Sequence, residues 1–305
     1  MKQAIEDNNY RKLVKGLEKK KIKKERIWEI DFLRCIPIIL VMLYHLCYYF
    51  AFIPQMLFVN YDEQILNYPA YNSFIHFCHY DIFTGDIFVN LLQPFFSGVF
   101  LFVCGISCSL TRSNVRRSIY LWIVALLLSI ATYIFSIVSG TNFIIIFGVI
   151  HLMAFSVSAY MLLELFYKYV LEKDVEPITC LIIGLLIMLI GYLLNWPENE
   201  FIYDLNETIK NSHFIALGKY VGGQDFFPIF PKAGIIFVGI CFGKLLYGKQ
   251  KKSVLPSLYF KGLKPFCFIG SHTIWFYFLH PPLFITIIVL VMMAMGFKID
   301  FGSIL

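Results

Sequence analysis

Long apolar stretches alternate with short polar segments along the whole chain, and this pattern decides the fold class. Several windows of about twenty residues carry almost no charge, the length that a helix needs to cross a hydrocarbon core of roughly 30 Å. Because lipid offers the backbone no hydrogen bonds, such segments must be helical. We predict an all-α fold, a polytopic transmembrane helical bundle with about seven spans. The spans are placed near residues 30–53, 88–111, 116–138, 142–166, 177–195, 228–247 and 265–297.

The last predicted span is the longest and contains two consecutive prolines, Pro281 and Pro282. Proline removes a helical hydrogen bond and crowds the preceding turn, so we expect a kink at this point. Residues 27–297 then form one membrane domain, with a basic cytosolic tail at 1–26 and a short tail at 298–305.

Composition agrees with a membrane protein. The chain is 59% hydrophobic and only 15% charged, whereas soluble domains are about 25% charged. The net charge of +6 resides in residues 1–26, which hold ten Lys or Arg against four Asp or Glu. We expect this tail to set topology and to touch anionic headgroups. No nucleic-acid-binding module accompanies the charge, so we expect no nucleic-acid partner.

The charge of the loops alternates along the chain. Loop 54–87 carries four acidic and no basic residues, and loop 196–227 is mainly acidic, whereas 112–117 holds three arginines and 244–264 holds six lysines. The positive-inside rule then places the N-terminus in the cytosol and the C-terminus outside, which agrees with seven crossings. We predict a multi-pass protein of the cell membrane. Residues 71–83 are rich in aromatics and resemble an interfacial helix on the outer leaflet.

Ionisable residues occur inside the first predicted span. Arg34 and His45 are eleven residues apart, so on a helix they lie within about 20° of each other and roughly 16 Å apart along the axis. An ionisable group in a membrane span is costly and usually faces the bundle interior or a wet cavity. We therefore treat both as candidate catalytic residues. Asp31, three residues before Arg34, is positioned to pair with its guanidinium.

Two further histidines, His151 and His280, fall at a depth similar to that of His45. Three histidines from three spans thus could line one chamber in the outer half of the bilayer. A buried histidine is also commonly a hydrogen-bonded structural residue, and for His272 packing or capping is as good an interpretation as function. His76 and His79 lack an acidic third ligand, so we expect no metal site.

Five segments suggest a family. They are RIWEIDFLRCIPIILVMLYHLCYYF, FFSGVFLFVCGISCSLTRSNVRR, FIIIFGVIHLMAFS, DFFPIFPKAGIIFVGICFGKLLYGK and FIGSHTIWFYFLHPPLF. Together and in this order they resemble the heparan-alpha-glucosaminide N-acetyltransferase catalytic domain family of transmembrane acyltransferases. The sequence departs from the family pattern at Cys35, where glycine is usual, at Ser271, which replaces an arginine, and at Pro281, which replaces a glutamine.

The resemblance implies an enzyme that moves an acetyl group from cytosolic acetyl-CoA to an amine or hydroxyl of an extracytoplasmic acceptor. That acceptor would be an amino sugar or an envelope glycan. Acetyl-CoA is the expected co-substrate, and no metal or haem is expected. His45 would act as general base or as acetyl carrier, and Asp225 would face the acceptor. The basic cytosolic face would hold the CoA phosphates through Arg112, Arg116, Arg117 and the lysines of 244–264.

Two other functions remain open at this point. A proton-coupled secondary transporter would use His45, His151 and His280 as a proton relay. A membrane haem protein would need two histidines that face each other, and the chain has no CxxCH attachment motif. Oligomeric state is also open, and a homodimer is compatible with the sequence.

Overall fold

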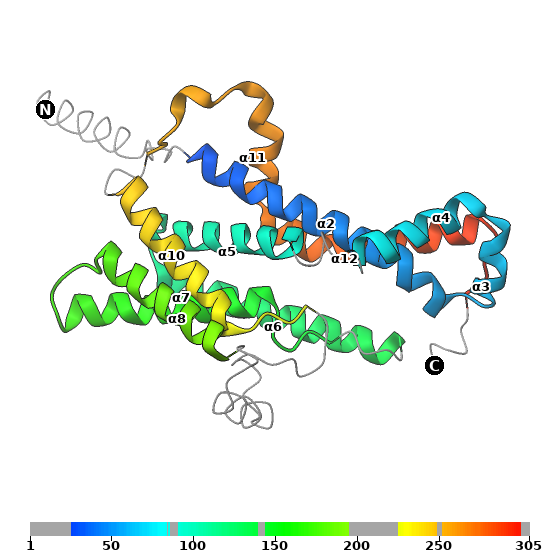
Figure 1. The fold of residues 1–305 in the computed structure, drawn as a ribbon, viewed down its shortest axis with the longest axis horizontal. Coiled ribbons are helices and arrows are strands. Elements are labelled where there is room, and N and C mark those ends of the chain that lie inside the picture. Colours follow the sequence, from blue (N-terminus) through cyan, green and yellow to red (C-terminus); the bar gives the residue numbers. More distant parts are fainter. Residues whose placement is uncertain are drawn as a thin grey trace, which may run out of the picture.

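The computed structural model shows a helical bundle (Figure 1). It describes residues 26–83, 85, 91–139, 144–194, 225–248 and 252–299. The expected basic tail up to residue 25, most of the acidic loop 196–227 and residues 300–305 lie outside the described residues. The larger helices are α2 (Trp28–Leu57), α5 (Gln93–Leu110), α6 (Asn114–Ser139), α7 (Val149–Tyr169), α8 (Pro177–Leu194), α10 (Ile229–Tyr247) and α12 (Thr273–Ala294).

These helices confirm the predicted polytopic α-helical bundle. Six are long and apolar enough to cross a membrane, namely α2, α5, α6, α7, α10 and α12, and α8 is a shorter apolar helix. Each predicted span therefore corresponds to an apolar helix. The orientation of the termini stays a prediction.

Small residues allow the central helices to approach closely. α10 packs against both α5 and α8, while α6 packs against α7. A Cβ on Gly105 of α5 would lie 2.0 Å from the carbonyl oxygen of Ile236 in α10, and one on Gly234 of α10 would lie 2.5 Å from that of Gly184 in α8. Glycines at such crossings let backbones meet, which is how helices associate where lipid supplies no hydrophobic driving force.

The segment after α2 is helical, as the aromatic pattern predicts. It contains α3 (Tyr61–Gln64), η1 (Ile65–Asn67), α4 (Pro69–Phe77) and the short π-helix η2 (Cys78–Phe83). α4 and η2 lie along the C-terminal half of α2 (Figure 1). Their place relative to the membrane surface stays a prediction.

The last predicted span differs from expectation. It is divided into α11 (Lys264–Ser271) and α12, and the break falls at His272, whose φ of −120° and ψ of 25° are not helical. α12 continues as one helix through Pro281 and Pro282. Prolines are tolerated inside a membrane helix when neighbouring groups satisfy the freed backbone. α2 packs against α5, α11 and α12, so it forms the centre of the candidate site.

Candidate active site

Two histidines from different helices meet inside the bundle. His45 lies in α2, and His280 lies in α12 with its side chain buried. His45 Nδ1 and His280 Nε2 are 2.7 Å apart, and the two rings are almost parallel, at 12°. The structure thus brings together two residues that the sequence placed at similar depths in separate spans. They are called the histidine pair below.

Hydrogen bonds assign the protons on the neutral histidine pair. His280 Nδ1 lies 3.0 Å from the carbonyl oxygen of Phe276. A carbonyl can only accept, so this nitrogen carries the proton and His280 Nε2 is an acceptor. His45 Nδ1 must then donate to His280 Nε2. His45 Nε2 is left as the nitrogen whose lone pair is free to take a proton or attack a carbonyl carbon.

The two prolines after His280 make this turn of α12 unusual. Pro281 and Pro282 have no N–H, so the carbonyls of Tyr277 and Phe278, four residues earlier, lack their usual helical donors. A carbonyl without a partner is unfavourable in an apolar interior. Backbone groups freed in this way at membrane depth are tolerated where they line a cavity or meet other protein groups. The His280 ring forms a hydrogen bond with the backbone of Tyr277 as well as that of Phe276, so one of the two freed carbonyls has a partner on the same helix.

Asp225 is connected to the histidine pair through Tyr277. The Tyr277 hydroxyl donates to Asp225 Oδ2 at 2.6 Å, and the Tyr277 ring centroid is 5.9 Å from that of His280. Asp225 lies in the segment just before α10, outside the spanning helices. Burial raises the pKa of Asp225 to about 6, although the Tyr277 hydrogen bond and the Lys232 ammonium act in the opposite direction. The predicted acceptor-side residue is thus linked to His280 through Tyr277, which lies about one turn earlier in α12.

His151 has a different environment from the histidine pair. The backbone N–H of Gly148 donates to His151 Nδ1 at 3.3 Å, and His151 Nε2 lies 3.1 Å from the Ser129 hydroxyl oxygen. Since Nδ1 accepts, Nε2 carries the proton and donates to Ser129. Both ring nitrogens are used, and the side chain caps the first turn of α7. Within the described residues it makes neither a hydrogen bond nor a ring contact with the histidine pair.

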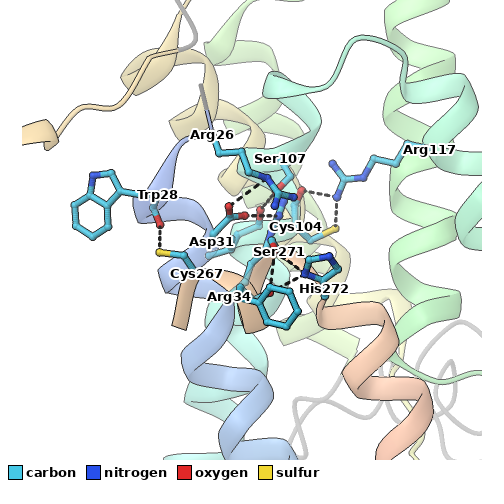
Figure 2. A network of polar contacts seen from close by, with 12 residues as sticks. Arg26, Trp28, Asp31, Arg34, Cys104, Ser107, Arg117, Cys267, Ser271 and His272 are labelled. Atoms are coloured by element: carbon cyan, nitrogen blue, oxygen red, sulfur yellow. Dashed lines mark hydrogen bonds and ion pairs between the residues drawn. The ribbon is translucent and has the colours of Figure 1, made fainter. Parts of the chain in front are cut away.

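A second polar cluster surrounds Arg34 in α2 (Figure 2). Arg34 Nη1 lies 3.4 Å from Asp31 Oδ1, the partner that the spacing predicts, and Nη2 donates to the hydroxyl of Ser107 in α5. Asp31 is shared, because Arg26 Nε is 3.7 Å from its other oxygen. α11 approaches α2 closely here, since a Cβ on Gly270 would lie 1.6 Å from the Asp31 carbonyl oxygen.

Of the three arginines assigned to the basic turn after the second span, the structure brings one into this cluster. Arg117 Nη2 donates to the carbonyl oxygen and the sulfur of Cys104 at 3.2 and 3.3 Å, and Nη1 is 3.6 Å from the sulfur of Cys108. Arg112 and Arg116 are exposed. Only Arg117 therefore points into the bundle.

Arg34 and Arg117 line one cavity of about 490 Å³, called the arginine cavity below. Ser107, Cys104 and His272 also line it. The histidine pair is not part of its lining. Roughly 16 Å of α2 separates Arg34 from His45. The arginine cavity and the histidine pair are therefore two separate sites along the same helix.

Sequence reasoning left three of these residues unassigned: Ser107, Tyr277 and His272. One signal was available for His272. Its Nδ1 lies 2.9 Å from the carbonyl oxygen of Phe268, the same arrangement that His280 makes with Phe276. This arrangement is visible in the sequence as the repeat F-x3-H-x3-F-x3-H over residues 268–280, in which each histidine follows a phenylalanine by four residues. Ser107 and Tyr277 are of types too common in membrane helices to be singled out.

The comparisons with known proteins agree with this picture. A family model described as "Heparan-alpha-glucosaminide N-acetyltransferase, catalytic" matches residues 71–282, more than half of the chain. The matched range includes Arg117, Asp225, His272 and His280, whereas Arg34 and His45 precede it. No curated protein and no solved structure matches the chain.

Proposed function

Because the chain belongs to the heparan-alpha-glucosaminide N-acetyltransferase catalytic domain family, we propose that it moves an acetyl group through the membrane. The donor is acetyl-CoA on the cytosolic side, and the acceptor is an amine or hydroxyl of an extracytoplasmic amino sugar or glycan. Membership makes it a multi-pass membrane protein of the acyltransferase type. The membrane, the donor, the acceptor and the role of each side chain are our proposal.

The hydrogen bond between His45 and His280 is the observation that carries the proposal. His280 is held by the Phe276 carbonyl and accepts from His45 Nδ1, which fixes the orientation and tautomer of the His45 ring. When His45 Nε2 takes a proton, the Nδ1–H···N bond becomes charge-assisted and stronger. His280 therefore acts on His45 as the orienting partner of a general base.

Two chemical routes use this geometry. In direct transfer, the acceptor oxygen or nitrogen attacks the thioester carbonyl carbon while His45 Nε2 removes its proton, and the carbon–sulfur bond breaks to release the CoA thiolate. In the covalent route, His45 Nε2 itself attacks the thioester carbonyl carbon, and the carbon–sulfur bond breaks to release the CoA thiolate. The acceptor then attacks the acetyl carbon, the bond to Nε2 breaks, and the acceptor's proton passes to Nε2. Both routes require His45 Nε2 to be unprotonated, the state that the hydrogen bonds of the neutral pair indicate.

The remaining residues take supporting roles in the proposal. Asp225 takes the acceptor side in this proposal; it is joined to Tyr277, one turn before His280, and its carboxylate can orient an amine or hydroxyl. Arg34 lies on the donor side, with Asp31 as its partner. His151 supports this region by capping α7 beside Asp225, since a Cβ on Gly148 would lie 3.1 Å from Asp225 Oδ2.

Turnover of labelled donor tests the proposal. Purified protein in detergent is given acetyl-CoA labelled in the acetyl group, with glucosamine as acceptor, and release of CoA thiol and labelled product are measured. We expect His45→Gln to lose at least about 100-fold of the rate, the usual contribution of a general base. His76→Gln, which changes an exposed histidine of α4, is the matched control and should keep wild-type rates.

The same two proteins, wild type and His45→Gln, also distinguish direct transfer from the acetyl-histidine route and an acetyltransferase from a proton-coupled transporter. Label that stays on wild-type protein after acid quenching, and is absent from His45→Gln, supports the acetyl-histidine route. Wild-type protein that neither releases CoA thiol nor transfers label, yet couples solute movement to protons in vesicles, would instead identify a transporter.

A further inference from the structure

Arg117 is an inward-pointing, partly buried cation without a carboxylate partner in the described part of the chain. Among the described residues its guanidinium donates to the Cys104 carbonyl and to the sulfurs of Cys104 and Cys108, and both cysteines belong to the apolar core. The two ion pairs that the described residues make both use Asp31. A charge withdrawn from water is costly unless it is paired. Arg117 therefore has donors available for an anion that enters the arginine cavity.

The neighbouring charges add to this excess. Arg34 lines the same cavity, and its one carboxylate partner, Asp31, also serves Arg26. Three guanidinium groups (Arg26, Arg34 and Arg117) against one carboxylate leave a formal excess of two positive charges. Guanidinium groups bind phosphate oxygens in bidentate fashion, which suits a ligand with two phosphate charges.

His272 also lines the arginine cavity, and it lies at the break between α11 and α12. Its Nδ1 lies 2.9 Å from the Phe268 carbonyl oxygen and 2.8 Å from the Ser271 hydroxyl, whose own proton is donated to the same carbonyl. A carbonyl can only accept, so Nδ1 carries the proton, and in the neutral ring Nε2 is the acceptor that remains for a ligand. The close approach of Gly270 to Asp31 places this break beside Arg34. Two guanidinium groups and one imidazole from three different elements thus surround a space of about 490 Å³.

We propose that the arginine cavity binds the diphosphate of the acyl donor, with Arg34 and Arg117 on the phosphate oxygens. His272 Nε2 accepts a hydrogen bond from the hydroxyl of the pantoyl group next to the diphosphate. This proposal rests on the proposed function for the identity of the donor. It assigns the diphosphate to Arg117 and not to the exposed Arg112 and Arg116, and it leaves the acyl arm to extend along α2 toward His45.

Binding of a ligand series to the full chain in lipid nanodiscs tests the assignment by calorimetry. CoA and 3′-dephospho-CoA both keep the diphosphate and should bind within about threefold of each other. Pantetheine lacks it and should bind at least about 30-fold more weakly, as expected for the loss of charge-assisted hydrogen bonds. Arg117→Gln should weaken CoA by a similar factor and leave pantetheine unchanged.

Matched variants keep the result interpretable. Arg112→Gln and Arg116→Gln remove the same charge from the same turn and should leave CoA affinity within about twofold of wild type, because both side chains are exposed. Arg117→Lys keeps the positive charge but loses the planar guanidinium that binds two phosphate oxygens at once. This variant replaces Arg117→Gln in the binding measurements if Arg117→Gln does not fold. His272→Phe should weaken CoA and pantetheine alike, since both contain the pantoyl hydroxyl.

The outcomes also separate this inference from the proposed function. His45→Gln should bind CoA like wild type while losing turnover. Unchanged CoA affinity in Arg117→Gln, or equal losses in Arg112→Gln, would overturn the inference even if acetyl transfer is observed. If wild type binds inorganic diphosphate through Arg117 but not CoA, the anion site stands and the donor assignment fails.

Discussion

The Tyr277 hydroxyl donates to Asp225 at 2.6 Å and so ties α12 to the segment that precedes α10. Asp225 also lies against Gly148 at the start of α7, where a Cβ would come within 3.1 Å of its Oδ2. Three separate parts of the chain therefore converge on one enclosed carboxyl group. The protonation state of that group should influence both stability and the geometry around His280.

Stability should fall as pH rises through the range in which Asp225 ionises. Burial raises the pKa of Asp225 from 3.8 to about 6, so the folded state binds the proton more tightly than the unfolded state. Between about pH 4 and pH 6 the unfolding free energy then decreases, by on the order of 3 kcal/mol at most. Asp225→Asn keeps an acceptor for Tyr277 but cannot ionise, so it should lose this dependence. Thermal unfolding of both proteins at pH 4 and pH 7 measures the difference.

The groups around Asp225 are Tyr277, Lys232, Tyr44, Tyr49 and the start of α7. None of these side chains ordinarily titrates between pH 4 and pH 7, so the comparison isolates the carboxyl group. Identical pH dependence in wild type and Asp225→Asn would contradict this account of the site.

Gly270 and Gly98 form a matched pair for testing the close contact between α11 and α2. A Cβ added at position 270 would lie 1.6 Å from the Asp31 carbonyl oxygen, whereas nothing lies within 4 Å of a Cβ at position 98. Gly270→Ala should cost about 1–3 kcal/mol of stability as the helices separate. Gly98→Ala should be neutral or stabilising by up to about 1 kcal/mol. Thermal unfolding in detergent checks both, and equal effects would show that α11 does not pack on α2 in this way.

His151 and His280 should respond differently to the loss of their imidazoles. His151→Leu removes the partner of the Gly148 N–H and of the Ser129 hydroxyl, so we expect a loss of about 1–3 kcal/mol in stability. Turnover per folded molecule should change little. His280→Leu should mainly reduce turnover, because His45 loses the acceptor that orients it. A large loss of turnover in folded His151→Leu protein would instead place His151 in the chemistry.

Membrane orientation can be tested with two exposed positions. Glu63 lies in α3 of the acidic loop, and Lys261 lies in η6 (Lys261–Leu263) of the basic segment. With the N-terminus in the cytosol, an impermeant maleimide on intact cells should label Glu63→Cys but not Lys261→Cys. After the cells are opened, both should react. The reverse pattern would invert the topology and place the arginine cavity on the outer side.

The bundle itself could be predicted because a chain in lipid has few alternatives. Uncharged windows of span length must be helices, and all seven predicted spans coincide with apolar helices. Their similar depths predicted that His45, His151 and His280 lie near one another, and the structure brings His45 and His280 into direct contact. The depth of a residue along a helix axis can be calculated by counting residues, because each residue of an α-helix adds a fixed rise.

The direction of each side chain around its helix was harder to predict. Arg116 and Arg117 are neighbours in sequence, yet they point about 100° apart, and only Arg117 faces α5. Which of them turns inward depends on how α6 packs, and the sequence does not fix that packing. His151 was grouped with the histidine pair by depth, whereas its hydrogen bonds belong to the local cap at Gly148.

The break in the last span was misplaced for a related reason. Pro281 and Pro282 carry the strongest local breaking signal, but α12 continues through them, and the chain turns at His272 instead. The tight contact between Gly270 and Asp31 is a tertiary constraint that fixes α11 against α2. Local propensity gave no indication of it, although it brings His272 to the arginine cavity.

Transfer across a sealed bilayer tests the central claim most directly. Proteoliposomes with acetyl-CoA labelled in the acetyl group on the side of the basic loops, and glucosamine only on the other side, are assayed for labelled N-acetylglucosamine. We predict product on the glucosamine side with wild type, and a loss of at least about 100-fold with His45→Gln. Equal product from wild type and His45→Gln, or none from wild type although CoA binds, would contradict the account.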